Sequence, residues 1–145
     1  MVPSPTYDHQ DIAALLWTWL RQHAPQQLRA SLATGVVLSM GNTLEPDVLL
    51  VEATIAGSRH YAMPDQVTLV VEVVCPGTKR RDRLEKPTEY AAAGIPHYWR
   101  IEQGPVRIAA YDLVNGRYEP VAESDTELVL STPFEIKLPI RDITP

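Results

Sequence analysis

The sequence predicts an α+β fold: an N-terminal helix, a mostly β middle, a second helix and a C-terminal β-meander. Three observations predict it. Residues 11–23 carry apolar side chains at helical spacing, residues 67–74 form an apolar strand in which five of eight residues are valine, and short extended segments separated by turn residues follow residue 96. With 145 residues, the chain is expected to form a single domain, residues 1–145, with one core.

The first predicted element is a helix over Asp11–His23, whose apolar residues from Ile12 to Trp19 recur at helical spacing. Thr6 or Asp8 is suited to cap its N-terminus, because a short polar side chain can accept a hydrogen bond from a free backbone N–H. Pro25 should end the helix, since a proline disfavours helical geometry at the residue before it.

Extended structure is predicted for most of the next segment. Residues Leu28–Met40 are compatible with strand, Gly41-Asn42 is typical of a turn, and Asp47–Val51 is a short apolar strand after Pro46. Residues Ala56–Pro64 are expected to form a loop. Val67–Val74 is apolar on both faces, as a central strand covered on both sides would be.

A second helix is predicted over Thr78–Ala93, after Cys75-Pro76-Gly77 ends the valine-rich strand, and Gly94 is suited to its C-terminus. Pro87 conflicts with a helix interior and fits better near a helix start. Strands follow, and the Asn115-Gly116 pair indicates a tight hairpin. The predicted strands are His97–Glu102, Val106–Leu113, Arg117–Ala122, Glu127–Leu130 and Phe134–Leu138.

Composition limits the class of protein. Eighteen acidic against 13 basic residues give a net charge of −5, so any contact with nucleic acid would need a local basic patch. The single cysteine, Cys75, excludes an internal disulfide framework, and no segment is apolar enough to span a membrane. We therefore expect a cytoplasmic protein that does not contact a membrane.

Two acidic residues are the first candidates for chemistry. Glu72 interrupts an apolar strand, and Asp47 opens another. If these strands are neighbours, the two carboxylates converge, and convergent oxygen ligands are what Mg²⁺ requires. A bound metal would lower the pKa of a water molecule and stabilise a phosphoryl transition state. Alternatively, Glu72 pairs with a buried basic residue and Asp47 only begins its strand.

Basic residues near these acids are the next candidates. Asp82, Lys86 and Tyr90 are four residues apart and would share one stripe of a continuous helix. Lys86 could orient water or neutralise charge on a phosphate, or it could form a surface pair with Asp82. A dense basic run could contact DNA phosphates, or it could simply be a solvated helix start. The run consists of Lys79, Arg80, Arg81 and Arg83.

The order of these motifs resembles the Uma2 family, whose members are labelled putative restriction endonucleases. The resemblance rests on Pro46-Asp47 and on residues 69–102, LVVEVVCPGTKRRDRLEKPTEYAAAGIPHYWRIE. This segment contains the Glu-Val-x-Ser-Pro-like stretch at 72–76, with Cys75 in place of serine, then Asp82, Lys86, Tyr90, Gly94-Ile95 and Tyr98-Trp99. Ser4-Pro5 and His9-Gln10 before the helix also fit, so the resemblance covers nearly the whole chain.

The resemblance implies a restriction-endonuclease-like mixed β-sheet flanked by helices, of the PD-(D/E)xK nuclease superfold. It also implies a Mg²⁺-dependent phosphodiesterase site, with Mn²⁺ as a second possible metal. Asp47 and Glu72 would be the acidic metal ligands, the backbone carbonyl of Val73 would complete the metal shell, and Lys86 would supply the cation that the superfold usually places two residues after Glu72. DNA is the implied substrate, and a homodimer is the implied assembly.

The sequence departs from the family in one respect that bears on activity. Family members usually begin with an acidic N-terminal hairpin, and we expect this domain to lack it. Three functions therefore remain open. A metal-dependent DNA endonuclease is favoured by Asp47, Glu72 and Lys86 together, whereas a catalytically silent, dimeric binding domain is favoured by the lacking hairpin and the acidic net charge. The third is a metal-dependent hydrolase of a phosphoester that is not nucleic acid.

Overall fold

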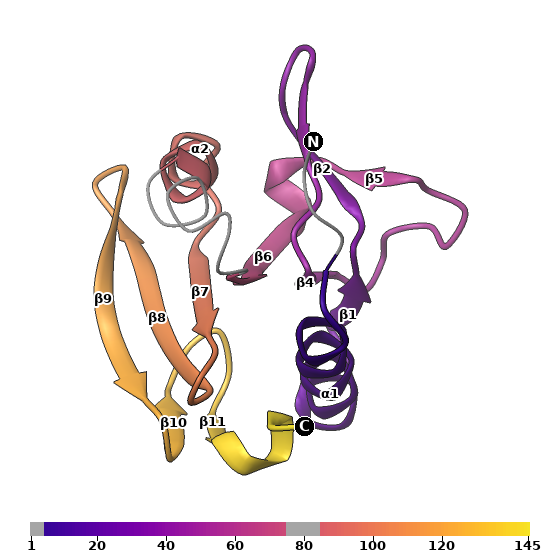
Figure 1. The fold of residues 1–145 in the computed structure, drawn as a ribbon. Coiled ribbons are helices and arrows are strands. Elements are labelled where there is room, and N and C mark those ends of the chain that lie inside the picture. The colour runs from indigo at the N-terminus through magenta and orange to yellow at the C-terminus, as the bar shows by residue number, and fades with distance from the viewer. Residues whose placement is uncertain (1–4, 75–84) are drawn as a thin grey trace.

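A six-stranded mixed sheet is the centre of the computed structural model, which describes residues 5–74 and 85–145 (Figure 1). Its strand order is β1-β4-β6-β7-β8-β9. Strands β6 and β7 pair in parallel, and all other neighbours in this sheet are antiparallel. The strands are β1 (Leu28–Leu32), β4 (Val48–Glu52), β6 (Val67–Val73), β7 (His97–Glu102), β8 (Arg107–Val114) and β9 (Arg117–Ser124).

One face of the sheet packs against the helix α1 (Tyr7–His23) and the C-terminal segment. Residues Val48, Leu50, Leu69 and Val71 point to this face, where they join Leu16 and other apolar side chains of α1. The C-terminal segment consists of β10 (Glu127–Leu130), β11 (Ile136–Pro139) and the 3-10 helix η4 (Ile140–Ile143).

The other face carries a second apolar cluster. Leu49, Val51 and Val70 alternate with the residues of the first face, as side chains along a strand must. The short helix α2 (Lys86–Ala92) covers this face with Tyr90. Beside it lies a three-stranded sheet made of β3 (Asn42–Leu44), β2 (Gly35–Ser39) and β5 (Tyr61–Ala62), and the 3-10 helix η1 (Pro64–Gln66) precedes β6.

The predicted α+β fold class and the meander β7-β8-β9 are confirmed. The hairpin at Asn115-Gly116 is confirmed as well, and both residues have the positive φ angles that a tight two-residue turn requires (52° and 80°). The N-terminal helix begins earlier than predicted, at Tyr7, because the Thr6 side chain accepts a hydrogen bond from the backbone N–H of His9.

In the middle of the chain, one expectation is confirmed with an interruption and another is wrong. Leu28–Met40 is mostly extended, but Ala33, with a φ of 42°, separates β1 from β2, and these strands belong to different sheets. The predicted loop Ala56–Pro64 contains β5, which pairs in parallel with the start of β2. Local patterning shows neither the separation of β1 from β2 nor the pairing of β5 with β2, because both depend on strands far away in the sequence.

The second helix agrees with its prediction where the structure describes it. It ends at Ala92, and Pro87 lies in its first turn, where a missing N–H removes no helical hydrogen bond. The predicted part from 78 to 84 lies outside the described residues. Among the described helices, none is long and apolar enough to cross a membrane.

Candidate functional site

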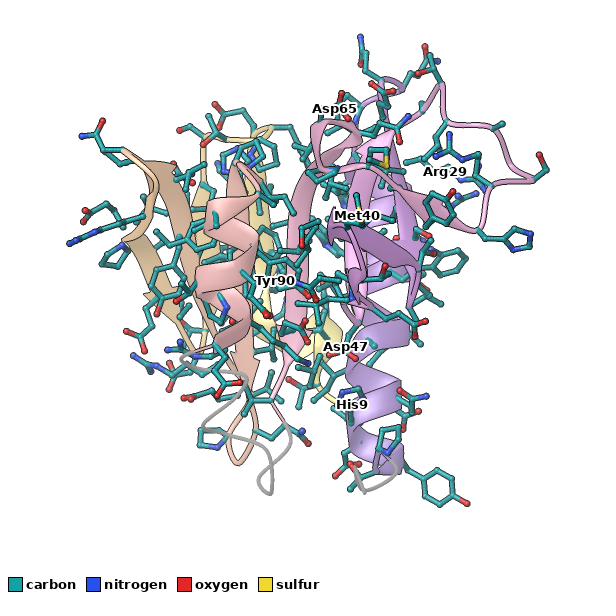
Figure 2. The ribbon with its side chains drawn as sticks, turned by 90° about the horizontal axis from the view of Figure 1, so that it is seen from above. His9, Arg29, Met40, Asp47, Asp65 and Tyr90 are labelled. Atoms are coloured by element: carbon teal, nitrogen blue, oxygen red, sulfur yellow. The ribbon has the colours of Figure 1, made fainter. Side chains whose placement is uncertain are left out.

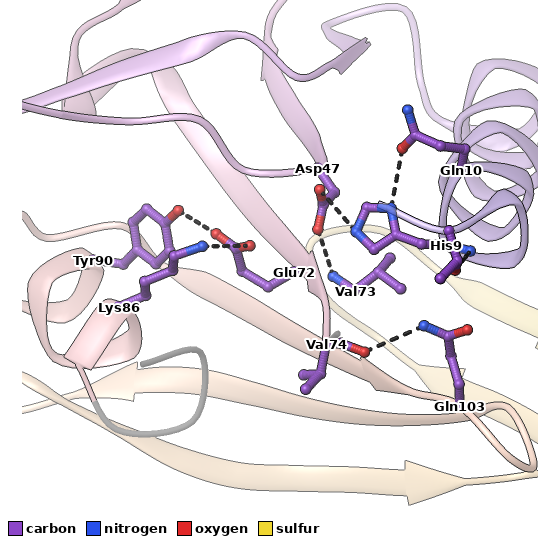
Figure 3. Close-up of polar contacts among 10 residues, drawn as sticks. His9, Gln10, Asp47, Glu72, Val73, Val74, Lys86, Tyr90 and Gln103 are labelled. Atoms are coloured by element: carbon purple, nitrogen blue, oxygen red, sulfur yellow. Dashed lines mark hydrogen bonds and ion pairs between the residues drawn. The ribbon is translucent and has the colours of Figure 1, made fainter. Parts of the chain in front are cut away.

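Asp47 and Glu72 meet at one end of the central sheet (Figure 3). Strands β4 and β6 are antiparallel with Val48 opposite Val71, so the next residues in register are Asp47 and Glu72. The two strands are therefore neighbours, which was the condition for the two carboxylates to converge.

Asp47 is held by contacts from two elements. Its Oδ2 accepts a hydrogen bond from the backbone N–H of Val73 at 2.7 Å, and its Oδ1 lies 3.3 Å from Nε2 of His9. His9 is 5 % exposed, and its Nδ1 lies 3.0 Å from Oε1 of Gln10. The α1 helix therefore reaches the end of the sheet through His9, which orients the Asp47 carboxylate.

The Asp47 carboxylate raises the pKa of His9 through their hydrogen bond, although burial of the ring acts in the opposite direction. The negative charge of Glu72 adds to the increase. His9 therefore takes up a proton more readily than an exposed histidine. As a cation, it would partly balance the two carboxylates.

Glu72 is the most buried charged group described at this site, with 2 % of its surface exposed. Its Oε1 accepts a hydrogen bond from the Tyr90 hydroxyl at 2.5 Å, and its Oε2 lies 3.4 Å from Nζ of Lys86. Burial and the nearby carboxylate raise the pKa of Tyr90, so its hydroxyl stays protonated and remains a donor. A buried carboxylate without such partners would be costly.

Lys86 and Tyr90 lie one turn apart on α2, on the shared stripe that their spacing of four residues predicts, and both side chains contact Glu72 (Figure 3). Glu72 thus has a basic partner, as the alternative interpretation expects, although that partner is only partly buried. Asp82 and the basic run formed by Lys79, Arg80, Arg81 and Arg83 lie outside the described residues, and their roles stay predictions.

Sequence reasoning did not select His9 as a site residue. The sequence did contain a signal for it: His9 lies three residues before Ile12 and seven before Leu16, which places it on the buried stripe of α1. A histidine on such a stripe must have a polar partner. The partner, Asp47, is 38 positions further on, and only the packing of α1 against the sheet reveals it.

The residues at this site fit a hard divalent cation with few protein ligands. Mg²⁺ is usually bound by one or two carboxylates, with water and substrate phosphates in the other positions. Asp47 and Glu72 could supply such carboxylates, because each oxygen that already accepts one hydrogen bond keeps a second lone pair. Among residues 5–74 and 85–145, no group of three or more His, Cys, Asp or Glu side chains could enclose a metal. Any metal here would therefore keep much of its water.

Two comparisons with known proteins match the chain. The Uma2 family, described as "Putative restriction endonuclease", matches residues 1–141. A solved structure, described as a putative nuclease belonging to DUF820 from Anabaena variabilis, superposes with a TM-score of 0.73 at 14% identity, covering 97% of this chain and 82% of that one. No protein with a curated description matches the sequence.

Proposed function

This chain belongs to the Uma2 family. On that premise we propose that it is an endonuclease that hydrolyses phosphodiester bonds in DNA and depends on Mg²⁺, which Mn²⁺ can replace. The observation that carries the proposal is the pairing of Asp47 with Glu72 across β4 and β6, with Lys86 beside Glu72. Two carboxylates and one cation at a single point are suited to phosphoryl chemistry.

In this proposal Asp47 and Glu72 hold the metal, and the backbone carbonyl of Val73 is the third protein ligand. When bound, Mg²⁺ would lower the pKa of a water molecule and neutralise charge on the phosphate. Lys86, whose side chain is 22% exposed, can reach solvent and the substrate while its Nζ stays close to Glu72. Its charge would stabilise the extra negative charge that develops on the phosphate during attack.

The surrounding residues keep the two carboxylates in place. The Val73 N–H and His9 each fix one oxygen of Asp47, and the Tyr90 hydroxyl fixes Oε1 of Glu72. Such supporting hydrogen bonds orient metal ligands and raise their affinity. The site is therefore preorganised by elements from both faces of the sheet, α1 and α2.

Cleavage of a labelled DNA duplex in Mg²⁺, in Mn²⁺ and in EDTA tests the proposal, with the variant Glu72→Gln. We expect metal-dependent cleavage by the parent and a loss of about 10²-fold or more in the variant, because a metal ion supplies several kcal/mol of stabilisation. Glu119→Gln, the same change at an exposed position of β9, is the matched control.

Glu72→Gln cleavage at the parent rate would refute the assignment to this site. Calorimetric titration of Mg²⁺ and Mn²⁺ into the parent and Asp47→Asn gives an independent readout, in which saturable binding should be lost in the variant. Turnover of a simple aryl phosphodiester without DNA cleavage would instead point to a phosphoester hydrolase acting outside nucleic acid.

A second candidate function is a catalytically silent, dimeric binding domain. One observation favours it: each oxygen of Asp47 and Glu72 already has a protein partner, which is how a purely structural polar cluster would look. The two candidates differ in the metal titration. A silent domain would bind DNA or a protein partner, without saturable metal binding and without turnover.

A further inference from the structure

A small pocket lies on the face of β4 that carries the second apolar cluster, some distance from the acidic residues. It has a volume of about 170 Å³ and is bounded by β1, β4, β5 and the segment between β4 and β5. Leu49, Val51 and Ala62 form its buried floor. Its other lining residues include two arginines, Arg29 and Arg59, and no acidic residue.

Arg29 and Arg59 give this pocket its charge. Both are exposed, and within the described residues neither forms an ion pair with a carboxylate. Cζ of Arg59 lies 5.4 Å from the centre of the Tyr61 ring, which holds the guanidinium over the aromatic face. A Cβ added at Gly57 would lie 3.9 Å from Nη1 of Arg29, so the Arg29 side chain extends along the β4–β5 segment.

The backbone around the pocket is ordered by hydrogen bonds. The Ala53 N–H donates to the carbonyl of Gln27 at 2.8 Å, and the Arg59 N–H donates to the carbonyl of Ala56 at 3.0 Å. These bonds tie the β4–β5 segment to the start of β1 and form a turn before Arg59. The two guanidinium groups are thus presented from short, fixed segments, which lowers the entropic cost of binding a ligand between them.

We propose that this pocket binds a phosphate group of a DNA strand, between the guanidinium groups of Arg29 and Arg59. Guanidinium is suited to phosphate because its planar donors form paired, charge-assisted hydrogen bonds. In a chain with a net charge of −5, two arginines that form no ion pair within the described residues are the kind of local patch that DNA needs. The inference rests on the proposed function, because it assigns a substrate contact to the same enzyme.

The position of the pocket fits a DNA strand that also reaches Asp47. Leu49 and Val51, which line the pocket, follow Asp47 by two and four residues, and Asp47 directly precedes their strand, β4. At about 3.3 Å per residue, these two residues lie roughly 7 Å and 13 Å from Asp47 along the chain direction of β4. This is well below one turn of a duplex, about 34 Å, so one short duplex would be long enough to reach both places. Figure 2 shows Arg29 and Asp47 on the half of the molecule that carries α1.

The test is binding of a short fluorescent DNA duplex, followed by anisotropy in EDTA over a series of NaCl concentrations. The proteins are the parent, Arg29→Gln, Arg59→Gln and Arg141→Gln, the last a matched control on η4. We expect Arg29→Gln and Arg59→Gln each to weaken binding about tenfold at low salt. Log affinity falls as log salt rises, and in each variant this fall should be shallower, its slope smaller in magnitude by about one, because one phosphate contact is lost. Arg141→Gln should remain close to the parent.

Two outcomes would overturn the inference. One is that Arg29→Gln and Arg59→Gln bind DNA like Arg141→Gln. The other is that inorganic phosphate, titrated in an NMR experiment, binds the parent and is lost from both variants while DNA binding is unchanged, which would identify a free phosphate as the ligand. Thermal melting of each variant verifies that the fold is intact.

The experiments can refute the inference and the proposed function independently of each other. Binding in EDTA involves no cleavage, so a parent that binds DNA through Arg29 and Arg59 but never cleaves it supports the pocket and refutes the nuclease. Conversely, a parent that cleaves DNA with Mg²⁺ and loses no affinity in either arginine variant supports the nuclease and refutes the pocket.

Discussion

Two charged contacts on the same sheet differ in burial far more than in distance. Lys86 and Glu72 lie 3.4 Å apart, with Glu72 almost fully buried, whereas Arg107 on β8 and Glu123 on the edge strand β9 lie 2.6 Å apart with side chains 41% and 56% exposed. Distance alone would rank the exposed pair first. Water and salt screen the exposed pair, however, while the buried carboxylate depends on its protein partners. Burial, more than distance, therefore decides which of the two contacts the protein depends on.

The sharpest test of this comparison is to remove Lys86. We expect Lys86→Gln to lower single-turnover DNA cleavage by about 10²- to 10³-fold, since a fixed donor that stabilises developing charge has about this value. Lys137→Gln, at an exposed position of β11, should leave cleavage unchanged. If Lys86→Gln cleaves at the parent rate, then Lys86 is only a structural partner of Glu72.

The second test concerns the tyrosine that supports the buried carboxylate. Tyr90→Phe removes the hydrogen bond to Glu72, and we expect it to lower the free energy of unfolding by about 1.5 to 3 kcal/mol, because the acceptor is charged. Tyr118→Phe removes a hydrogen bond to the carbonyl of Ile95, a neutral acceptor, so the expected loss is about 1 kcal/mol. Urea unfolding measures both, and equal losses would contradict the special role of the buried carboxylate.

An intermediate case lies between these extremes. His97 and Asp112 pair across β7 and β8 at 2.7 Å, with side chains 14% and 33% exposed. We expect Asp112→Asn, which keeps a hydrogen-bond acceptor but loses the charge, to cost about 0.5 to 1 kcal/mol in urea unfolding. A cost above that of Tyr90→Phe would break the relation between burial and effect.

The smallest effect is expected at the exposed pair, and it depends on pH. The hydrogen bond from Arg107 and the charge of that residue lower the pKa of Glu123. A lowered pKa in the folded state stabilises the protein above the pKa of the unfolded chain, and this is lost as the pH falls through the folded value. The melting temperature of Glu123→Gln should therefore lie slightly below that of the parent at neutral pH, and the difference should vanish in acid and at high salt. A difference that persists in acid would contradict this origin.

Local patterning was enough to predict the elements with strong local signals. The valine-rich strand, the first helix and the Asn115-Gly116 hairpin depend on residues close together in the sequence, and all three were confirmed. By contrast, β5 is two residues long and exists only because Gly35 and Val36 lie beside it, 26 positions earlier. A strand of this kind has no signal of its own.

The residues of the candidate site also fall into those with a local sequence signal and those that only tertiary packing reveals. Glu72 was noticeable because a charge interrupts an apolar strand, and Lys86 and Tyr90 share a helical stripe, so three positions could be selected from the sequence. The contact between His9 and Asp47 could not, since it joins α1 to the start of β4 through tertiary packing. The pocket with Arg29 and Arg59 was missed for the same reason.

The pairing of the strands also bears on the order in which the molecule assembles. β8 and β9 are joined by a turn in which Val114 pairs with Arg117, so this hairpin closes a minimal loop. The strands that bring Asp47, Glu72 and Lys86 together pair across much longer stretches of chain: Val48 with Val71, and Leu69 with His97. The chain entropy lost on closing a loop rises with its length, and distant pairings form more slowly. We expect the meander to fold first and the pairing of β4 with β6 to be completed last, so that a partly folded chain already contains the sheet edge before Asp47 and Glu72 are brought together.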